Sequence, residues 1–94
     1  MNRSLDKGLY ALQQAFTKGD LVKHDYKNNE AIGVISENGY IIWNGKHYSS
    51  ISTFATNHKR TITGRPISAN GWDECCWKKP NDTLWSYTFD KRKD

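Results

Sequence analysis

The amino-acid sequence predicts a single α+β domain, and three observations lead to this class. The first is an N-terminal stretch whose apolar residues recur with helical periodicity. The second is a series of short segments rich in β-branched and aromatic residues, separated by the hairpin turns Asn38-Gly39 and Asn44-Gly45. The third is a serine-rich helix start at residues 50–52. We therefore expect an amphipathic helix, an antiparallel meander of about four strands, a second short helix and a closing strand pair.

The first helix is predicted over residues 4–18. Its apolar positions fall on one face of a helix: Leu5, Leu9, Leu12 and Phe16. Ser4 is suited to cap the start of this helix and Gly19 is suited to end it. We expect the helix to pack on a sheet, and we assign it no chemistry.

The meander is predicted at residues 21–26, 30–36, 40–43 and 46–48. Residues 32–35 are continuously apolar, which predicts that both faces of the second strand are covered. Gly33 in this run is a place where another part of the chain can approach closely.

The second half of the chain changes character after residue 49. The predicted elements are a helix at 50–59, a loop at 61–70, a strand at 72–77, a turn at 78–82, a last strand at 83–89 and a charged tail at 90–94. One domain is therefore expected to occupy residues 1–94, with its core at about residues 5–89.

The charge of the chain suits a polyanionic partner. The formal net charge is +4 over 94 residues, and the basic residues concentrate in the second half. They lie at Lys59-Arg60, Arg65, Lys78-Lys79 and residues 91–93. Aromatic residues reach 13%, so large rings are expected to fill a core that is short of aliphatic side chains.

We expect an intracellular protein with reduced thiols and no membrane partner. No apolar run is long enough to span a membrane, and residues 1–4 lack the apolar block of a signal peptide. Cys75 and Cys76 are adjacent on a predicted strand, so one thiol should enter the core and the other should face the surface. Because no C-x-x-C pair is present, we expect no metal site and no cofactor.

A series of short motifs runs through most of the chain. They are Gly33-Val34-Ile35, Asn38-Gly39, Gly45 to Tyr48, Ser50-Ile51-Ser52 with Ala55, and Asn70-Gly71-Trp72 with Trp77. Together, over roughly residues 5–89, these motifs resemble the RAMA domain, a module associated with restriction systems and adenine methylases. That family usually has Ser-Pro-Ser where this chain has Ser50-Ile51-Ser52, and isoleucine can still occupy the first helical position.

The resemblance implies a non-enzymatic module that binds double-stranded DNA. The role proposed for the family is recognition of methylated DNA, in particular N6-methyladenine. The module would then reside with DNA, in the nucleus of a eukaryote or in the cytoplasm and nucleoid of a prokaryote. A protein partner or a fused enzyme domain would give such binding a consequence.

Candidate phosphate contacts lie at the start and end of the second predicted helix, in its loop and in a later turn. They are Ser50, Ser52, Lys59, Arg60, Arg65, Lys78 and Lys79. Hydroxyl and N–H groups at a helix start suit a phosphate, and the cations would neutralise it. The structural alternatives are an ordinary helix cap for the serines and a solvated charged face for the cations.

The candidates for base or methyl recognition are Asn70, Trp72, Trp43 and Tyr48. We expect Trp72 to be presented by a turn beside the long loop, where its ring could stack on a base. The Asn70 amide could pair with the N6 and N7 edge of an adenine. The alternatives are that most rings are core and that Asn70-Gly71 is an ordinary type I′ turn.

Two other function classes are considered. An enzyme is not expected, because His24, His47 and His58 are scattered and the chain has no nucleophile elbow or phosphate-cradling glycine loop. A Cys76 nucleophile with a histidine partner is the enzymatic alternative. The second class is a protein-interaction module, in which an exposed edge strand or ring surface docks a partner protein.

Overall fold

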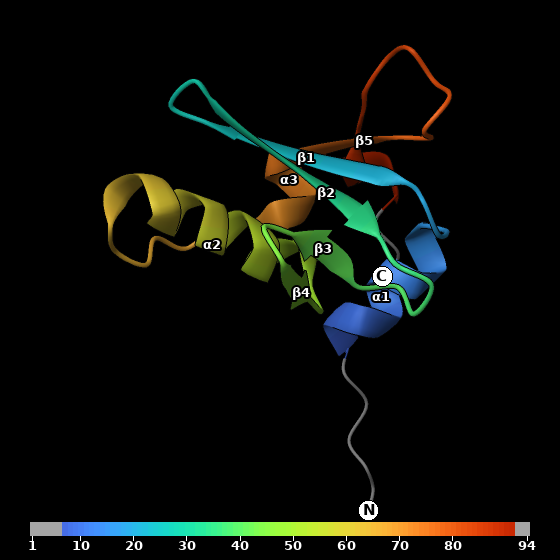
Figure 1. The fold of residues 1–94 in the computed structure, drawn as a ribbon, viewed down its shortest axis with the longest axis horizontal. Helices are drawn as coiled ribbons and strands as arrows, with labels where there is room; N and C mark the ends of the chain where they lie inside the picture. Colours follow the sequence, from blue (N-terminus) through green and yellow to red (C-terminus); the bar gives the residue numbers. More distant parts are fainter. Residues whose placement is uncertain (1–6, 92–94) are drawn as a thin grey trace, which may run out of the picture.

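The fold is that of a computed structural model, which describes residues 7–91. Its elements are α1 (Lys7–Ala15), β1 (Leu21–Tyr26), β2 (Asn29–Ile35), β3 (Ile41–Trp43), β4 (Lys46–Tyr48), α2 (Ile51–Thr63), α3 (Gly71–Glu74), β5 (Cys75–Lys78), β6 (Ser86–Tyr87) and the 3₁₀ helix η1 (Thr88–Lys91). The strands form one antiparallel sheet in the order β4-β3-β2-β1-β5-β6 (Figure 1). The predicted α+β class, with a helix, a meander, a second helix and closing strands, is confirmed.

The first helix buries the predicted face but ends earlier than residue 18. Leu12 and Phe16 are in the core. After Ala15 the chain turns, because the Asp20 carboxylate accepts the Thr17 N–H at 3.0 Å and the Gly19 N–H donates to the Ile35 carbonyl. Gly19 adopts a φ of +92°, which suits a residue without a side chain. The predicted cap Ser4 and the predicted apolar residue Leu5 lie outside the described residues.

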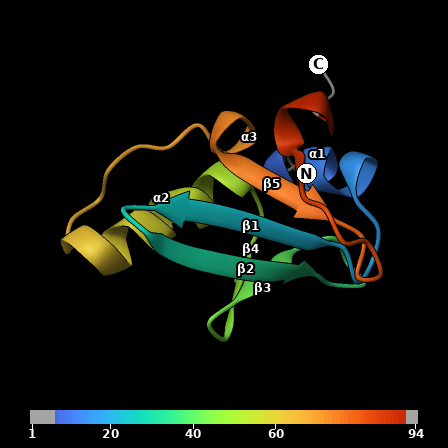
Figure 2. The same ribbon diagram turned by 90° about the horizontal axis from the view of Figure 1, so that it is seen from above.

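The second strand corrects one prediction. Ala31, Gly33 and Ile35 are buried, whereas Ile32 and Val34 are 40% and 42% exposed. The strand therefore has one covered face, because the helices α1, α2 and α3 all lie on one side of the sheet; Figure 2 shows β1 and β2 in front of them. The close approach at Gly33 is confirmed, since a Cβ added there would meet the Ile41 side chain and lie 3.2 Å from the Ile42 carbonyl oxygen.

The second helix begins as predicted and continues past residue 59. The Ser50 hydroxyl accepts the Thr53 N–H at 3.0 Å, which caps the helix. The helix runs on to Thr63 and ends where Gly64 enters the left-handed region with a φ of +79°. The loop is therefore residues 64–70, shorter than the predicted 61–70.

The C-terminal region differs most from the prediction. The expected strand at 72–77 is instead the single turn α3 followed by β5, and Asn70-Gly71 starts that helix rather than forming a type I′ turn. The last strand is confined to Ser86–Tyr87 and not 83–89. The buried Thr88 hydroxyl donates to the Trp72 carbonyl at 2.8 Å. This bond holds the start of η1 against α3. The predicted tail is thus helical at residues 90–91, and residues 92–94 lie outside the described part.

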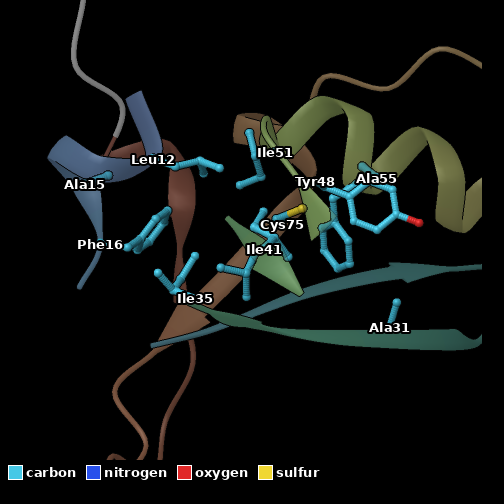
Figure 3. Close-up of a cluster of buried hydrophobic side chains, with 12 residues drawn as sticks. Leu12, Ala15, Phe16, Ala31, Ile35, Ile41, Tyr48, Ile51, Ala55 and Cys75 are labelled. Atoms are coloured by element: carbon cyan, nitrogen blue, oxygen red, sulfur yellow. The ribbon is translucent and has the colours of Figure 1, made fainter. Parts of the chain in front are cut away.

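The core lies between the sheet and the helices (Figure 3). It is built from Leu12, Phe16, Val22, Ile35, Ile41, Ile51, Phe54, Ala55 and Cys75 with their neighbours. Cys75 is buried and Cys76 is half-buried, which confirms the predicted division of the two thiols between core and surface.

Candidate nucleic-acid interface and a buried histidine pair

The two candidate serines at the start of α2 are engaged within the fold. The Ser50 hydroxyl caps the helix and donates to the Thr53 hydroxyl at 2.7 Å. The Ser52 hydroxyl accepts the Gly71 N–H at 3.0 Å, which joins α2 to α3. The capping alternative therefore describes Ser50, and Ser52 serves a contact between two helices.

Lys59 lies inside the fold. Its side chain is 10% exposed, and its ammonium contacts the Glu74 carboxylate and the Ser68 carbonyl, each at 3.1 Å. The same ammonium lies 5.2 Å from the centre of the Tyr26 ring. Lys59 thus tethers α2 to α3 and to the loop between them, and it belongs neither to a solvated face nor to an exposed cationic surface.

The other candidate cations divide between two ends of the molecule. Arg60 and Arg65 are exposed at the end of α2 and in the following loop. Lys78 and Lys79 lie at the end of β5, on the opposite side in both views (Figures 1 and 2). Lys79 pairs there with Asp20 at 3.0 Å, and Lys78 donates to the Asp82 carbonyl at 2.8 Å. The seven predicted phosphate contacts therefore do not form one surface.

A cation that the sequence reasoning missed joins the two arginines. Lys27 lies in the β1–β2 turn, which both views place at the same end as the last turn of α2 (Figures 1 and 2). Within residues 7–91, the structure gives Lys27, Arg60 and Arg65 no ion pair. We call these three residues the α2-end cations. A lone lysine in a turn carries no sequence signal, because only the packing of the hairpin against α2 places this turn at the same end of the molecule as the last turn of α2.

The candidate rings form two separate clusters. Trp72 is half-buried on α3 and stacks on Phe16, with ring centres 6.0 Å apart, and Phe16 also contacts Trp77. Trp43 is half-buried on β3 and meets Phe54 at 5.7 Å and His58 at 5.5 Å.

The four candidates for base recognition do not converge on one pocket. Tyr48 is buried, and burial raises the pKa of its hydroxyl. The exposed Asn70 amide donates to the Asp73 carboxylate at 2.6 Å. A hollow of about 330 Å³ lies elsewhere, between the end of α1 and the β2–β3 turn, and is lined by Gln13, Phe16, Ile35, Glu37 and Asn38 among others.

The histidines predicted to be scattered include a pair that the fold brings together. His24 and His58 are both buried, and their Nδ1 atoms are 2.7 Å apart. The His24 Nε2–H donates to the Glu74 carboxylate at 3.0 Å. Burial and the neighbouring His24 lower the pKa of His58. Burial alone would raise the pKa of Glu74, but hydrogen bonds from His24, the Asn70 N–H and Lys59 together lower it.

The sequence did contain a signal for each histidine, although none for the pair. His58 follows Phe54 by four residues on the buried face of α2, and His24 follows Val22 by two residues on the buried face of β1. Their meeting depends on how α2 docks against the sheet, across 34 residues of sequence.

The enzymatic alternative needs a histidine beside Cys76, and the register of β5 separates this thiol from His24. This thiol pairs in register with Lys23, so it lies on the opposite face of the sheet from His24. Burial raises the pKa of the Cys76 thiol, which keeps it protonated. Among residues 7–91, no group of three or more His, Cys, Asp or Glu side chains could hold a metal ion.

Two comparisons with known proteins were made. A scan against protein-family models finds no match. A search of curated proteins likewise finds no match. In the part of the chain that the structure describes, no helix has the length and apolar character needed to cross a membrane.

Proposed function

We propose that this protein is a non-enzymatic DNA-binding module that contacts phosphates through the α2-end cations. The observation that carries the proposal is the gathering of Lys27, Arg60 and Arg65 at one end of the molecule, without ion pairs among the described residues. A cation that is free of carboxylates can release the counterions of a phosphate backbone on binding. Asp25 and Glu30, the acids of the same hairpin, lie within 4 Å of Lys23.

The resemblance to the RAMA domain supports the same proposal and adds adenine methylation as the mark to be read. We assign the recognition of the methylated base to the Trp43 ring, which is half-exposed. This ring contacts His58, and His58 lies two residues before Arg60 on α2. An N6-methyl group would add apolar surface to such a ring contact. Asn70 and Trp72 lie at the other end of the loop, so they are secondary candidates.

The test is binding to a duplex with and without N6-methyladenine at two salt concentrations. With three phosphate contacts, a plot of the logarithm of the association constant against the logarithm of the salt concentration should have a slope of about −2.7. Arg60→Glu with Arg65→Glu should abolish most of this binding. The matched control is Lys7→Glu with Lys18→Glu, which changes the net charge equally but lies on and just after α1.

Each outcome has a distinct meaning. Undetectable binding of the unaltered protein at low salt overturns the DNA proposal. Equal losses in the two charge-reversed proteins would mean that general charge, and not the α2-end cations, drives binding. Equal affinity for methylated and unmethylated duplexes would leave DNA binding standing and remove the methyl-reading role.

One observation favours the second candidate function, a module that docks a partner protein. The face of the sheet opposite the helices presents a cross-strand row in which Ile42, Val34 and Leu21 are neighbours. Val34 is 42% exposed, and Tyr87 on β6 is 69% exposed. Apolar side chains on an open sheet face are a surface that a partner could cover. If Val34→Glu removes a cellular phenotype that the arginine reversals leave intact, docking replaces DNA binding as the function.

A further inference from the structure

Hydrogen bonds link the network around the buried histidine pair to Ser68 and Asn70, near the end of the α2–α3 loop. Glu74 uses one carboxylate oxygen to accept from His24 at 3.0 Å and from Lys59 at 3.1 Å. Its other oxygen accepts the Asn70 N–H at 3.0 Å. Lys59 in turn donates to the Ser68 carbonyl at 3.1 Å. Residues 68–70 are therefore held by two side chains that belong to the same network as the histidines.

The distances determine how many protons the histidine pair can hold. A separation of 2.7 Å between two Nδ1 atoms requires one proton between them. His24 carries a second proton on Nε2, because the Glu74 carboxylate can only accept. In the uncharged pair, His58 therefore donates from Nδ1 to His24 and keeps a bare Nε2.

Further protons strain this arrangement in two steps. The first additional proton goes to the bare Nε2 of His58 and creates a charge at a side chain that is 3% exposed. A second additional proton would place two N–H groups against each other across 2.7 Å, which breaks the contact. The neutral pair is thus the state that the packed structure accommodates.

The carboxylate that contacts the pair, that of Glu74, is shared between His24 and Lys59. Lys59 and Glu74 already form an ion pair with each other. Asp25, next to His24, favours a charge on His58, whereas burial and His24 oppose it more strongly. The elements around the pair contribute Asp25 and Tyr26 from β1, Ala31 from β2, the Trp43 ring from β3, Lys59 from α2, Glu74 from α3 and Cys75 from β5.

We propose that this network is an acid-released latch, in which the neutral histidine pair positions Glu74 and Lys59 to hold residues 68–70 of the loop, and protonation of the pair frees this segment. A histidine in an unfolded or opened segment takes up a proton near pH 6.5. Because the pKa of His58 in the closed fold lies below this value, opening gains protons as the pH falls. The latch is therefore closed above about pH 6.5 and weakens below it. The latch does not require that Arg65 in the loop contacts DNA.

The experiment compares amide hydrogen exchange of the loop by NMR at about pH 7.5 and about pH 5.5, corrected for the intrinsic effect of pH. The key variant is His58→Asn, since its Nδ2 takes the place of Nδ1 and still donates to His24 but does not titrate. The matched control is His47→Asn, which removes an exposed histidine of β4. Protection of the loop amides should fall about tenfold at the lower pH in the unaltered protein and in the control, and should stay nearly constant in His58→Asn.

Two results would overturn the latch. One is loop protection that is independent of pH in the unaltered protein, and the other is an equal loss of protection in His58→Asn. If His58→Asn does not fold, side-chain ¹⁵N spectra of the unaltered protein decide the matter. These spectra should show His58 protonated on Nδ1 at the higher pH, and the loop resonances should shift at the same midpoint as the histidine pair. A His58 protonated on Nε2 at that pH, or a loop midpoint that follows His47, would refute the proposal.

Discussion

Replacing Gly71 with alanine tests how closely α2 and α3 are packed. A Cβ at this position would lie 2.5 Å from the carbonyl carbon of Ile51 and 2.6 Å from the amide nitrogen of Ser52. Both are backbone atoms at the start of α2, so no side-chain rotation can relieve the contact. The φ of Gly71 is not in the left-handed region, so the penalty comes from space and not from backbone conformation.

The expected magnitude is a balance of opposing effects. Alanine is favoured over glycine in a helix by about 1 kcal/mol, so secondary-structure preference alone predicts a more stable protein. Overpacking against a rigid neighbour typically costs about 1–3 kcal/mol, occasionally more. Separating the helices would also weaken the hydrogen bond from the Gly71 N–H to the Ser52 hydroxyl, at about 1 kcal/mol. Because both neighbours are backbone atoms, the overpacking cost lies at the upper end of its range. We therefore expect a net loss of about 3 kcal/mol, or a fall in Tm on the order of 15 °C for a domain of this size.

The assay is equilibrium unfolding in urea, followed by tryptophan fluorescence. Gly45→Ala is the matched control, because a Cβ added at that site would have no atom within 4 Å, although its φ is +77°. Its free energy of unfolding should fall by about 1–2 kcal/mol, the cost of placing alanine in the left-handed region. The reasoning fails if Gly71→Ala is as stable as the unaltered protein, or if it is destabilised less than Gly45→Ala.

Three further predictions concern the cap, the thiols and the pH dependence of stability. Ser50→Ala should lower the free energy of unfolding by about 1 kcal/mol, and an unchanged urea midpoint would contradict the capping role. A thiol reagent should modify Cys76 in the folded protein and Cys75 only on unfolding, since burial raises the pKa of Cys75 strongly; mass spectrometry of the modified peptides checks the order. The free energy of unfolding should decrease as the pH falls below about 6.5. The reason is that the pKa of His58 is lowered in the fold, so this histidine takes up a proton in the unfolded chain at a higher pH than in the folded protein. The free energy of unfolding should fall further below about pH 4.5, because the pKa of Glu74 is also lowered and the unfolded carboxylate protonates first; urea titrations that are flat from neutral pH to pH 4 would refute both assignments.

Local patterns in the sequence are sufficient to predict several elements of the fold. The first helix follows from apolar residues such as Leu12 and Phe16 at helical spacing, and the meander follows from turns that need a positive φ, such as Gly39 and Gly45. The start of α2 follows from the ability of Ser50 to cap it. These signals act within a few residues of chain, so they can be read without knowing the neighbours in space.

Features that depend on which elements meet could be seen only in the folded molecule. Ile32 and Val34 are apolar, yet no helix among residues 7–91 covers their face of the sheet, and composition cannot state on which side the helices pack. The same holds for Gly71, which resembles half of a hairpin turn in sequence but fits closely beneath the start of α2.

The candidate surface changed for the same reason. Docking α2 against β1 buries the charge of Lys59 and joins His24 to His58 across 34 residues of sequence. Burial forces a polar side chain to find a partner wherever the packing provides one, and that partner is not encoded near it in the chain. The sequence therefore predicts a basic second half, whereas the packing of α2 determines which of its cations remain at the surface.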